Sequence, residues 1–183
     1  METRYLILAG APKCESTTLY EALAAHPEIA VTQVKEPMFF SARDHLDQYF
    51  PKAYVQARRE QDFTAYRSFF QPPDRPVRLD ASVGYLEESG IPERIAAHLP
   101  SARILFLLRD PVERFLSFSR YQKQLALIQH DVSLEAYVRD NLTAAGKGAP
   151  MLPALSVGRY HERLSEWYAS FPPEQTRRLS AAH

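Results

Sequence analysis

The stretch that decides the fold is Arg4–Thr18, which reads RYLILAGAPKCESTT. Residues 4–9 form a short apolar run, and the segment after the loop carries apolar residues at helical spacing. This pattern predicts a strand over 4–9, a loop, and a helix over 17–26. A loop that joins a strand to the N-terminus of a helix presents backbone N–H groups that have no intrahelical partner. With a lysine and three hydroxyls added, such a loop is suited to binding an anion.

The loop GAPKCESTT (residues 10–18) does not follow the Walker A pattern, in which Lys-Ser/Thr comes directly after a second glycine. Lys13 comes three residues after Gly10, and Ser16 stands where that pattern has its lysine. An ordinary ATP or GTP site is therefore disfavoured, although a P-loop nucleotide kinase stays open as an alternative.

A second segment with anion-binding chemistry follows the apolar run at 103–108, which is typical of a buried parallel strand. This segment is Arg109–Ser117, RDPVERFLS. Its Asp-Pro pair suits the N-cap and first turn of a helix, which is predicted over 111–127. Arg109 would then stand at the carboxyl end of a strand, where open α/β sheets bind ligands. An arginine fork and a serine hydroxyl are suited to phosphate oxygens.

Two more segments complete the pattern: Lys35–Phe40 (KEPMFF) and Asp80–Leu86 (DASVGYL). In order and spacing, the four segments resemble those of sulfotransferases that use 3′-phosphoadenosine-5′-phosphosulfate (PAPS). The pattern is similar to that of carbohydrate- or heparan-type members, in a bacterial-like form. The resemblance runs from Arg4 to about Pro173. It implies sulfuryl transfer from PAPS to a hydroxyl or amine, with carbohydrate as the acceptor class and without a metal.

The same resemblance implies a role for each matching residue. Lys13 would offset charge on the leaving phosphate, and Glu36 would take the proton of the acceptor, so these two are the expected catalytic residues. The donor would be bound by Lys13, Cys14, Glu15, Ser16, Thr17, Thr18, Arg109 and Ser117. The acceptor would be contacted by Lys35, Asp80 and Tyr85.

Each of these roles has a structural alternative. The hydroxyls that follow Glu15 could simply cap the helix, which uses the same geometry as phosphate binding. Glu36 could be a surface carboxylate paired with Lys35, and Asp80 and Tyr85 could be structural.

Glu15 departs from the family, which normally has glycine at this position. A left-handed backbone there would strain any other residue by roughly 1–2 kcal/mol. A carboxylate close to a bound phosphate would also repel it. We therefore expect Glu15 to weaken donor binding. A degenerate, inactive relative that binds nucleotide or a partner remains an alternative function.

Strands that alternate with helices predict an α/β, three-layer P-loop-like fold with a central parallel sheet flanked by helices. Beyond the elements above, the sequence predicts a loop-rich stretch with short helices before residue 76 and a loop over 144–153. The remaining predicted strands lie near 29–33 and over 77–80, and the remaining predicted helices cover 90–98, 133–143 and 153–171.

Composition adds bounds on class and partners. The chain has 183 residues, 22 basic and 22 acidic, so charge gives no argument for nucleic acid or a membrane surface. Its single cysteine excludes an internal disulfide, and the six histidines show no zinc-ligand spacing. With neither a signal region nor an apolar run near ~20 residues, a cytoplasmic enzyme is expected. Acceptor identity and oligomeric state are not indicated.

The C-terminal tail differs from the family pattern. After Gln175 the family has an apolar strand, whereas this chain continues with the polar TRRLSAAH. We therefore expect one sulfotransferase domain over 1–183 that lacks the usual C-terminal part, including this strand.

Overall fold

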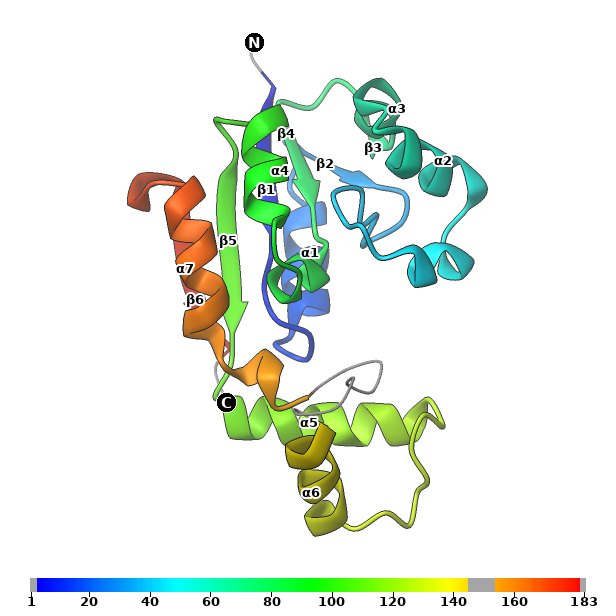
Figure 1. The fold of residues 1–183 in the computed structure, drawn as a ribbon. Coiled ribbons are helices and arrows are strands. Elements are labelled where there is room, and N and C mark those ends of the chain that lie inside the picture. Colours follow the sequence, from blue (N-terminus) through cyan, green and yellow to red (C-terminus); the bar gives the residue numbers. More distant parts are fainter. Residues whose placement is uncertain (1–2, 145–153, 182–183) are drawn as a thin grey trace.

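The computed structural model describes residues 3–144 and 154–181 (Figure 1). At its centre is a six-stranded sheet in the order β3-β2-β4-β1-β5-β6, and every neighbouring pair is parallel except β2 with β3. The strands are β1 (Arg4–Leu8), β2 (Ile29–Thr32), β3 (Phe70–Gln71), β4 (Val77–Asp80), β5 (Arg103–Leu108) and β6 (Thr176–Ser180).

Helices cover both faces of this sheet. The helices are α1 (Ser16–Ala24), α2 (Lys52–Glu60), α3 (Phe63–Ser68), α4 (Ile91–His98), α5 (Pro111–Gln124), α6 (Leu134–Ala144) and α7 (Tyr160–Ser170). In Figure 1, α4 and α7 lie in front of the sheet and α1 lies behind it, while α5 and α6 form a lobe below. The expected three-layer α/β fold with a mostly parallel central sheet is confirmed.

Strands β1 and β5 lie side by side in the sheet, and both are apolar enough to be covered on both of their faces. Ile7 and Phe106 are completely buried, and Leu8 pairs with Leu105 in parallel register. The chain leaves β1 through Gly10, where an added Cβ would lie 2.6 Å from the carbonyl oxygen of Leu107. Glycine is therefore required here, and it lets the loop after β1 lie directly against β5.

Three sequence predictions differ from the structure. The expected absence of a strand after Gln175 is wrong, because β6 pairs along β5 through backbone hydrogen bonds that do not depend on side chains. β6 lies at the edge of the sheet with most of its side chains exposed, so its polar residues are tolerated. The predicted helix over 153–171 is shorter, with a separate 3₁₀ turn at Ser156–Gly158 before α7. The antiparallel β3 was not predicted.

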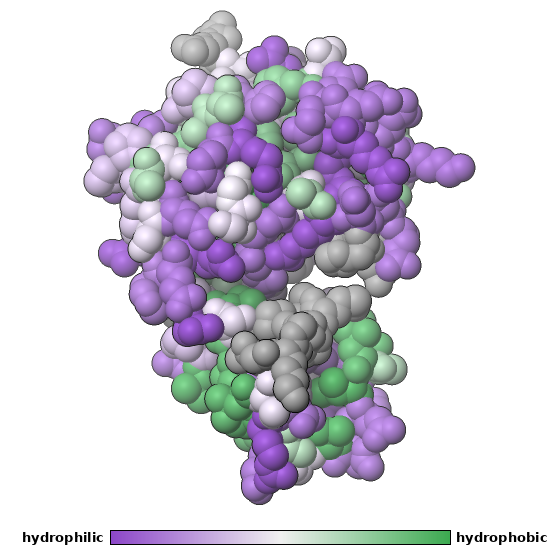
Figure 2. Space-filling model, in the orientation of Figure 1, coloured by the Kyte–Doolittle hydropathy of each residue, from purple (hydrophilic) through white to green (hydrophobic). Residues whose placement is uncertain are grey.

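The lobe formed by α5 and α6 has its own small core. Phe115 and Phe118 of α5 pack with Tyr137 of α6 and with Ala154. Arg114 is completely buried and donates to the carbonyl oxygen of Ala154. Apolar residues gather over this lobe in Figure 2; the large exposed ones on it are Val112, Tyr121, Leu125, Leu127, Leu134 and Leu142. The predicted loop at 144–153 lies, apart from Ala144, outside the described residues.

In the two described ranges, none of the helices combines the length and the apolar character that crossing a membrane would require.

Candidate active site

A cleft of about 700 Å³ lies beside the carboxyl ends of β1 and β5. It is lined by the loop after β1, the segment after β2, the turn after β4 and one face of α5. Its wall consists of Pro12, Lys13, Glu15, Ser16, Thr17, Lys35, Glu36, Met38, Arg43, Phe50, Val83, Gly84, Glu87, Arg109, Ser117, Phe118 and Tyr121. The cleft therefore joins residues from all four segments singled out in the sequence, and the segment Asp80–Leu86 contributes Val83 and Gly84 to it.

The loop after β1 holds two residues in the left-handed backbone region. Lys13 has a φ of 68° and Glu15 a φ of 63°. Glu15 is the N-cap of α1 but makes no side-chain cap bond, so it leaves the first N–H groups of the helix without that partner. Glu15 therefore carries the backbone cost considered from the sequence, roughly 1–2 kcal/mol. The Glu15 side chain is exposed and forms part of the cleft wall.

Lys13 is held against α5. Its Nζ lies 4.3 Å from the centre of the Tyr121 ring, a cation–π contact. No ion pair of Lys13 with a carboxylate is found in the part of the chain that the structure describes. Its positive charge is therefore available to an anion in the cleft.

Lys35 connects Glu36 with the hydroxyls that follow the loop after β1. Its Nζ lies 3.0 Å from Thr17 Oγ1 and 3.4 Å from Ser16 Oγ, and it donates to both hydroxyls. The same nitrogen lies 3.6 Å from Glu36 Oε1. The sequence predicts Lys35 as an acceptor contact. The structure places it between the hydroxyls of Ser16 and Thr17 and the carboxylate of Glu36.

Glu36 is the carboxylate that the segment after β2 brings into the cleft. Burial raises its pKa to about 7; Lys35 counteracts this shift, and the carboxylates of Asp80 and Glu87 add to it. About a third of its side chain, 35 %, is still exposed. A carboxylate with this pKa exists in both protonation states at neutral pH, as a general base requires.

Arg109 and Ser117 line the part of the cleft that is formed by the end of β5 and by α5. Asp110 caps α5 by accepting from the N–H groups of Val112 and Glu113, at 2.9 and 3.1 Å, as the sequence predicts. Arg109 directs its guanidinium to Glu113 Oε2 at 3.0 Å. Its carbonyl oxygen accepts a hydrogen bond of 3.0 Å from the Tyr160 hydroxyl. The Asp110 cap and the hydrogen bond from Tyr160 therefore hold the backbone around Arg109.

Asp80 and Tyr85 lie beneath the cleft and not in its wall, so the structure does not bring them to an acceptor. Both are completely buried. Asp80 Oδ2 accepts from the hydroxyls of Tyr66 and Tyr85 at 2.9 and 3.1 Å, and Asp80 Oδ1 accepts from Ser82 Oγ at 2.6 Å. Burial raises the pKa of Asp80 despite these hydrogen bonds.

This buried group supports the segment that carries Glu36. Ser82 Oγ accepts from the backbone N–H of Met38 at 3.0 Å, and the Tyr85 hydroxyl accepts from that of Phe40 at 3.2 Å. The contacts of Asp80 with Ser82 and Tyr85 therefore extend to the backbone two and four residues beyond Glu36.

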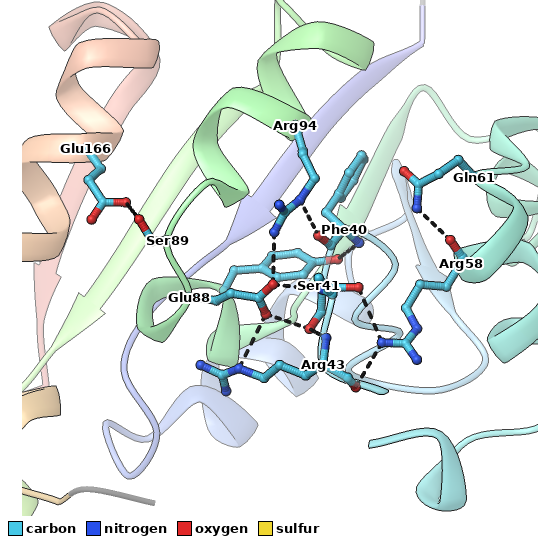
Figure 3. A network of polar contacts seen from close by, with 11 residues as sticks. Phe40, Ser41, Arg43, Arg58, Gln61, Glu88, Ser89, Arg94 and Glu166 are labelled. Carbon is cyan, nitrogen blue, oxygen red and sulfur yellow. Dashed lines mark hydrogen bonds and ion pairs between the residues drawn. The ribbon is translucent and has the colours of Figure 1, made fainter. Parts of the chain in front are cut away.

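A second network holds the end of the same segment (Figure 3). Glu88 accepts from Ser41 Oγ at 2.6 Å and from the backbone N–H of Ala42 at 2.7 Å, and it pairs with Arg94 at 2.9 Å. Arg43 Nε lies 3.4 Å from Glu88 Oε2, and Arg43 NH1 lies 3.6 Å from Glu87 Oε2. The segment between Glu36 and Arg43 is therefore fixed to the turn after β4.

Two expected donor residues do not reach the cleft with their side chains. The Cys14 side chain is completely buried, with Sγ 4.0 Å from the Tyr160 hydroxyl, and burial raises its pKa. Thr18 is exposed but is not part of the cleft wall. A contact of Cys14 with a bound anion is thus limited to its backbone.

Sequence reasoning missed four charged or aromatic residues of the cleft: Arg43, Phe50, Glu87 and Tyr121. Tyr121 follows Ser117 by four residues on α5, so helical spacing places both on one face and could have indicated it. Arg43 and Glu87 come from a loop and a turn, for which no periodicity exists.

Comparison with known proteins agrees with this geometry. The family model described as the sulfotransferase domain matches residues 3–180, and the chain belongs to that family. A sulfotransferase from Alicyclobacillus acidocaldarius superposes with a TM-score of 0.75 at 25 % identity, over 98 % of this chain and 73 % of that one.

Two curated relatives are similar in sequence. The bifunctional heparan sulfate N-deacetylase/N-sulfotransferase 1 of Mus musculus is 27 % identical over an alignment of 185 residues that covers 93 % of this chain and 19 % of the relative. Carbohydrate sulfotransferase 15 of Rattus norvegicus is 28 % identical over 222 residues, covering 93 % of this chain and 39 % of the relative. The chain thus spans about a fifth and about two fifths of the lengths of these relatives.

The family implies PAPS as co-substrate, and the cleft fits such a molecule. Its volume is in the range of small-molecule sites, roughly 300–1,000 Å³. Lys13, Arg109 and several hydroxyls offer phosphate contacts in it. Glu15 is the one lining residue of the loop after β1 that opposes an anion. Within the described ranges, no group of three or more His, Cys, Asp or Glu side chains lies together as metal ligands would.

Proposed function

We propose that this chain is a PAPS-dependent sulfotransferase that acts on a hydroxyl or amine of a carbohydrate acceptor. The observation that carries the proposal is the meeting of Lys13, Arg109, Ser117 and Glu36 in one cleft. Lys13 follows β1 and Arg109 follows β5, two adjacent parallel strands, so both cations arrive at the same edge of the sheet. The names of the curated relatives support carbohydrate as the acceptor class.

The residues divide the chemistry among them. PAPS supplies the sulfuryl group, and the bond between its sulfur and the 5′-phosphate oxygen breaks as the acceptor oxygen or nitrogen bonds to sulfur. Glu36 takes the proton that the acceptor loses. Lys13 and the hydroxyls of Ser16 and Thr17 offset the charge that develops on the 5′-phosphate. Arg109 and Ser117 hold the 3′-phosphate, and this scheme requires no metal.

Lys35 receives a different role from the one expected from the sequence. Because it contacts both Glu36 and the hydroxyl of Thr17, it fixes the position of the base relative to the start of α1. Its positive charge also counteracts the burial of Glu36 and thereby keeps part of that carboxylate ionised near neutral pH.

Calorimetric titration with 3′-phosphoadenosine-5′-phosphate (PAP), beside ATP–Mg²⁺, tests the donor site. We expect selective binding of PAP and a loss of about tenfold to a hundredfold in affinity in Arg109→Ala, because a charge-assisted phosphate contact is removed. Arg120→Ala, at an exposed arginine on α5, the helix that follows Arg109, is the matched control. ATP binding without a preference for the 3′-phosphate would favour a nucleotide kinase. PAP binding without turnover would favour the degenerate relative, for which the carboxylate of Glu15 is the specific argument.

A further inference from the structure

The end of the cleft that holds Glu36 has a distinct composition. We call this the acceptor end and define it by Lys35, Glu36, Met38, Arg43, Phe50, Val83, Gly84 and Glu87. It is formed by the segment after β2 and the turn after β4, whereas Arg109 follows β5 and Ser117 lies on α5. In the sheet, β1 stands between β5 and the strands β4 and β2. The acceptor end lies next to the base, so an acceptor must occupy it.

Both cations of the acceptor end are already neutralised. Lys35 lies 3.6 Å from Glu36, and Arg43 lies 3.6 Å from Glu87 and 3.4 Å from Glu88. Among the lining residues that the structure describes, no lysine or arginine at this end is without a carboxylate. The cations assigned to the donor differ. Lys13 Nζ lies against the ring of Tyr121, and the carboxylate beside Arg109, that of Glu113, is 40 % exposed, whereas Glu87 and Glu88 are largely buried.

The surroundings of these ion pairs are apolar and partly closed. Met38, Phe50 and Val83 line the same end, and the side chain of Glu87 is only 7 % exposed. Burial raises the pKa of Glu87 although Arg43 lies beside it. An added net charge is costly in such a place unless it receives an opposite charge of its own.

An anionic acceptor would also disturb the base. The pKa of Glu36 is already raised to about 7, and the neighbouring carboxylates contribute to that shift. A further negative charge nearby would raise this pKa again and leave less of the ionised base at neutral pH. A neutral acceptor has no such effect.

We propose that the acceptor end selects a neutral, hydroxyl-bearing saccharide or glycoside over a polyanionic one, because its paired cations leave no positive charge for a carboxylate or sulfate of the acceptor. Hydroxyls can exchange hydrogen bonds with the Arg43–Glu87 pair without changing its net charge. This inference rests on the proposed sulfotransferase function and narrows its substrate class.

Matched pairs of acceptors test the proposal with labelled PAPS as donor. The pairs are N-acetylchitotetraose with hyaluronan tetrasaccharide, octyl β-glucoside with octyl β-glucuronide, and 4-nitrophenyl β-glucoside with 4-nitrophenyl β-glucuronide. Within every pair that turns over, we expect kcat/KM to be higher for the neutral member. PAP affinity is measured on the same preparation.

Two variants change the charge balance in opposite directions. Glu87→Gln removes one partner of Arg43, so the ratio of kcat/KM for the anionic over the neutral member should rise about fivefold. Arg43→Gln leaves the carboxylates uncompensated, so the same ratio should fall. Glu135→Gln breaks the exposed Arg139–Glu135 pair on α6 and is the control, with an unchanged ratio.

The outcomes separate this inference from the function on which it rests. A preference for the anionic member in any pair, or an equal response of the ratio in Glu87→Gln and Arg43→Gln, overturns the inference. PAP binding with turnover of anionic acceptors only overturns it as well. Absence of PAP binding by folded protein, or PAP binding without turnover of any acceptor, contradicts the proposed function itself.

Discussion

At the scale of single residues, Glu15 has two unfavourable features: a left-handed backbone, which lowers stability, and a negative charge, which opposes an anion in the cleft. Its φ of 63° is unfavourable for a side chain, and its carboxylate belongs to the wall of the anion-binding cleft. We expect Glu15→Gly to relieve roughly 1–2 kcal/mol of backbone strain, partly offset by the greater freedom of glycine in the unfolded chain. The same change should tighten PAP binding about threefold to tenfold, since the exposed carboxylate is screened by solvent. Calorimetry with PAP and thermal unfolding measure the two effects.

Glu15→Gln separates these two causes, because it removes the charge and keeps the side chain in the left-handed region. We expect it to reproduce most of the gain in PAP affinity and little of the gain in stability. Equal PAP affinity in wild type, Glu15→Gln and Glu15→Gly would show that this carboxylate does not oppose the donor.

Glu36 gives the pH dependence expected of the reaction. The ionised form is the base, and with a pKa of about 7 its fraction increases with pH and reaches one half near neutrality. We therefore expect kcat/KM to rise about tenfold per pH unit well below pH 7 and to level off above it. Glu36→Gln should lower kcat by about 10²- to 10⁴-fold at unchanged PAP affinity. A midpoint near the ordinary glutamate value, or an active Glu36→Gln enzyme, would contradict the assignment.

At the scale of elements, the contact between the loop after β1 and strand β5 depends on one missing side chain. A Cβ at Gly10 would lie 2.6 and 2.7 Å from the backbone oxygen and nitrogen of Leu107. These are backbone atoms of β5 and cannot move aside as the end of a flexible side chain could. We expect Gly10→Ala to push this loop from β5, to destabilise the fold by about 1–3 kcal/mol and to weaken PAP binding. Thermal unfolding and PAP titration measure both. Gly158→Ala, where the nearest atom lies at an ordinary 3.5 Å, is the matched control and should change neither.

The buried group around Asp80 connects β4 to the segment that carries Glu36. Asp80→Asn places an amide donor opposite hydroxyls that now donate to the carboxylate, which should destabilise the fold by about 1–3 kcal/mol. We also expect kcat to fall, because Ser82 and Tyr85 hold the backbone at Met38 and Phe40. Asp74→Asn, at an exposed site, is the control. Full activity in a destabilised Asp80→Asn enzyme would show that the network supports the fold alone.

The elements that the sequence predicts well are those whose signals are local. The Asp-Pro cap of α5 and the strand, loop and helix around Lys13 depend on neighbours within a few residues. Both appear where they were predicted, although α5 ends at Gln124 and α1 at Ala24, before the predicted residues 127 and 26. β6 depends instead on the distant backbone of β5, so its polar residues gave no signal. The roles of Asp80 and Tyr85 likewise depend on burial, which one short motif does not reveal. Arg43 and Glu87 meet only through folding.

At the scale of the whole molecule, the donor site joins residues that are far apart in the chain. Lys13 lies in the loop after β1 and Ser16 begins α1, whereas Arg109 follows β5 and Ser117 lies on α5. A ligand that contacts both sets binds only the folded chain and stabilises all of it by mass action. At PAP concentrations near 100 times the dissociation constant, the gain is about 2.7 kcal/mol, which corresponds to a rise of about 5–10 °C in Tm for a chain of this size.

This rise should depend on both sets of residues, because each supplies one phosphate contact. We expect Arg109→Ala and Lys13→Ala each to remove about half or more of the Tm shift measured at the PAP concentration that is used for the wild type. ATP–Mg²⁺, which lacks a 3′-phosphate, should give a much smaller shift with the wild type, and Arg120→Ala should respond to PAP like the wild type. If Lys13→Ala lost the shift and Arg109→Ala kept it, the nucleotide would bind through the loop after β1 alone, and β5 would contribute to the fold but not to recognition of the donor.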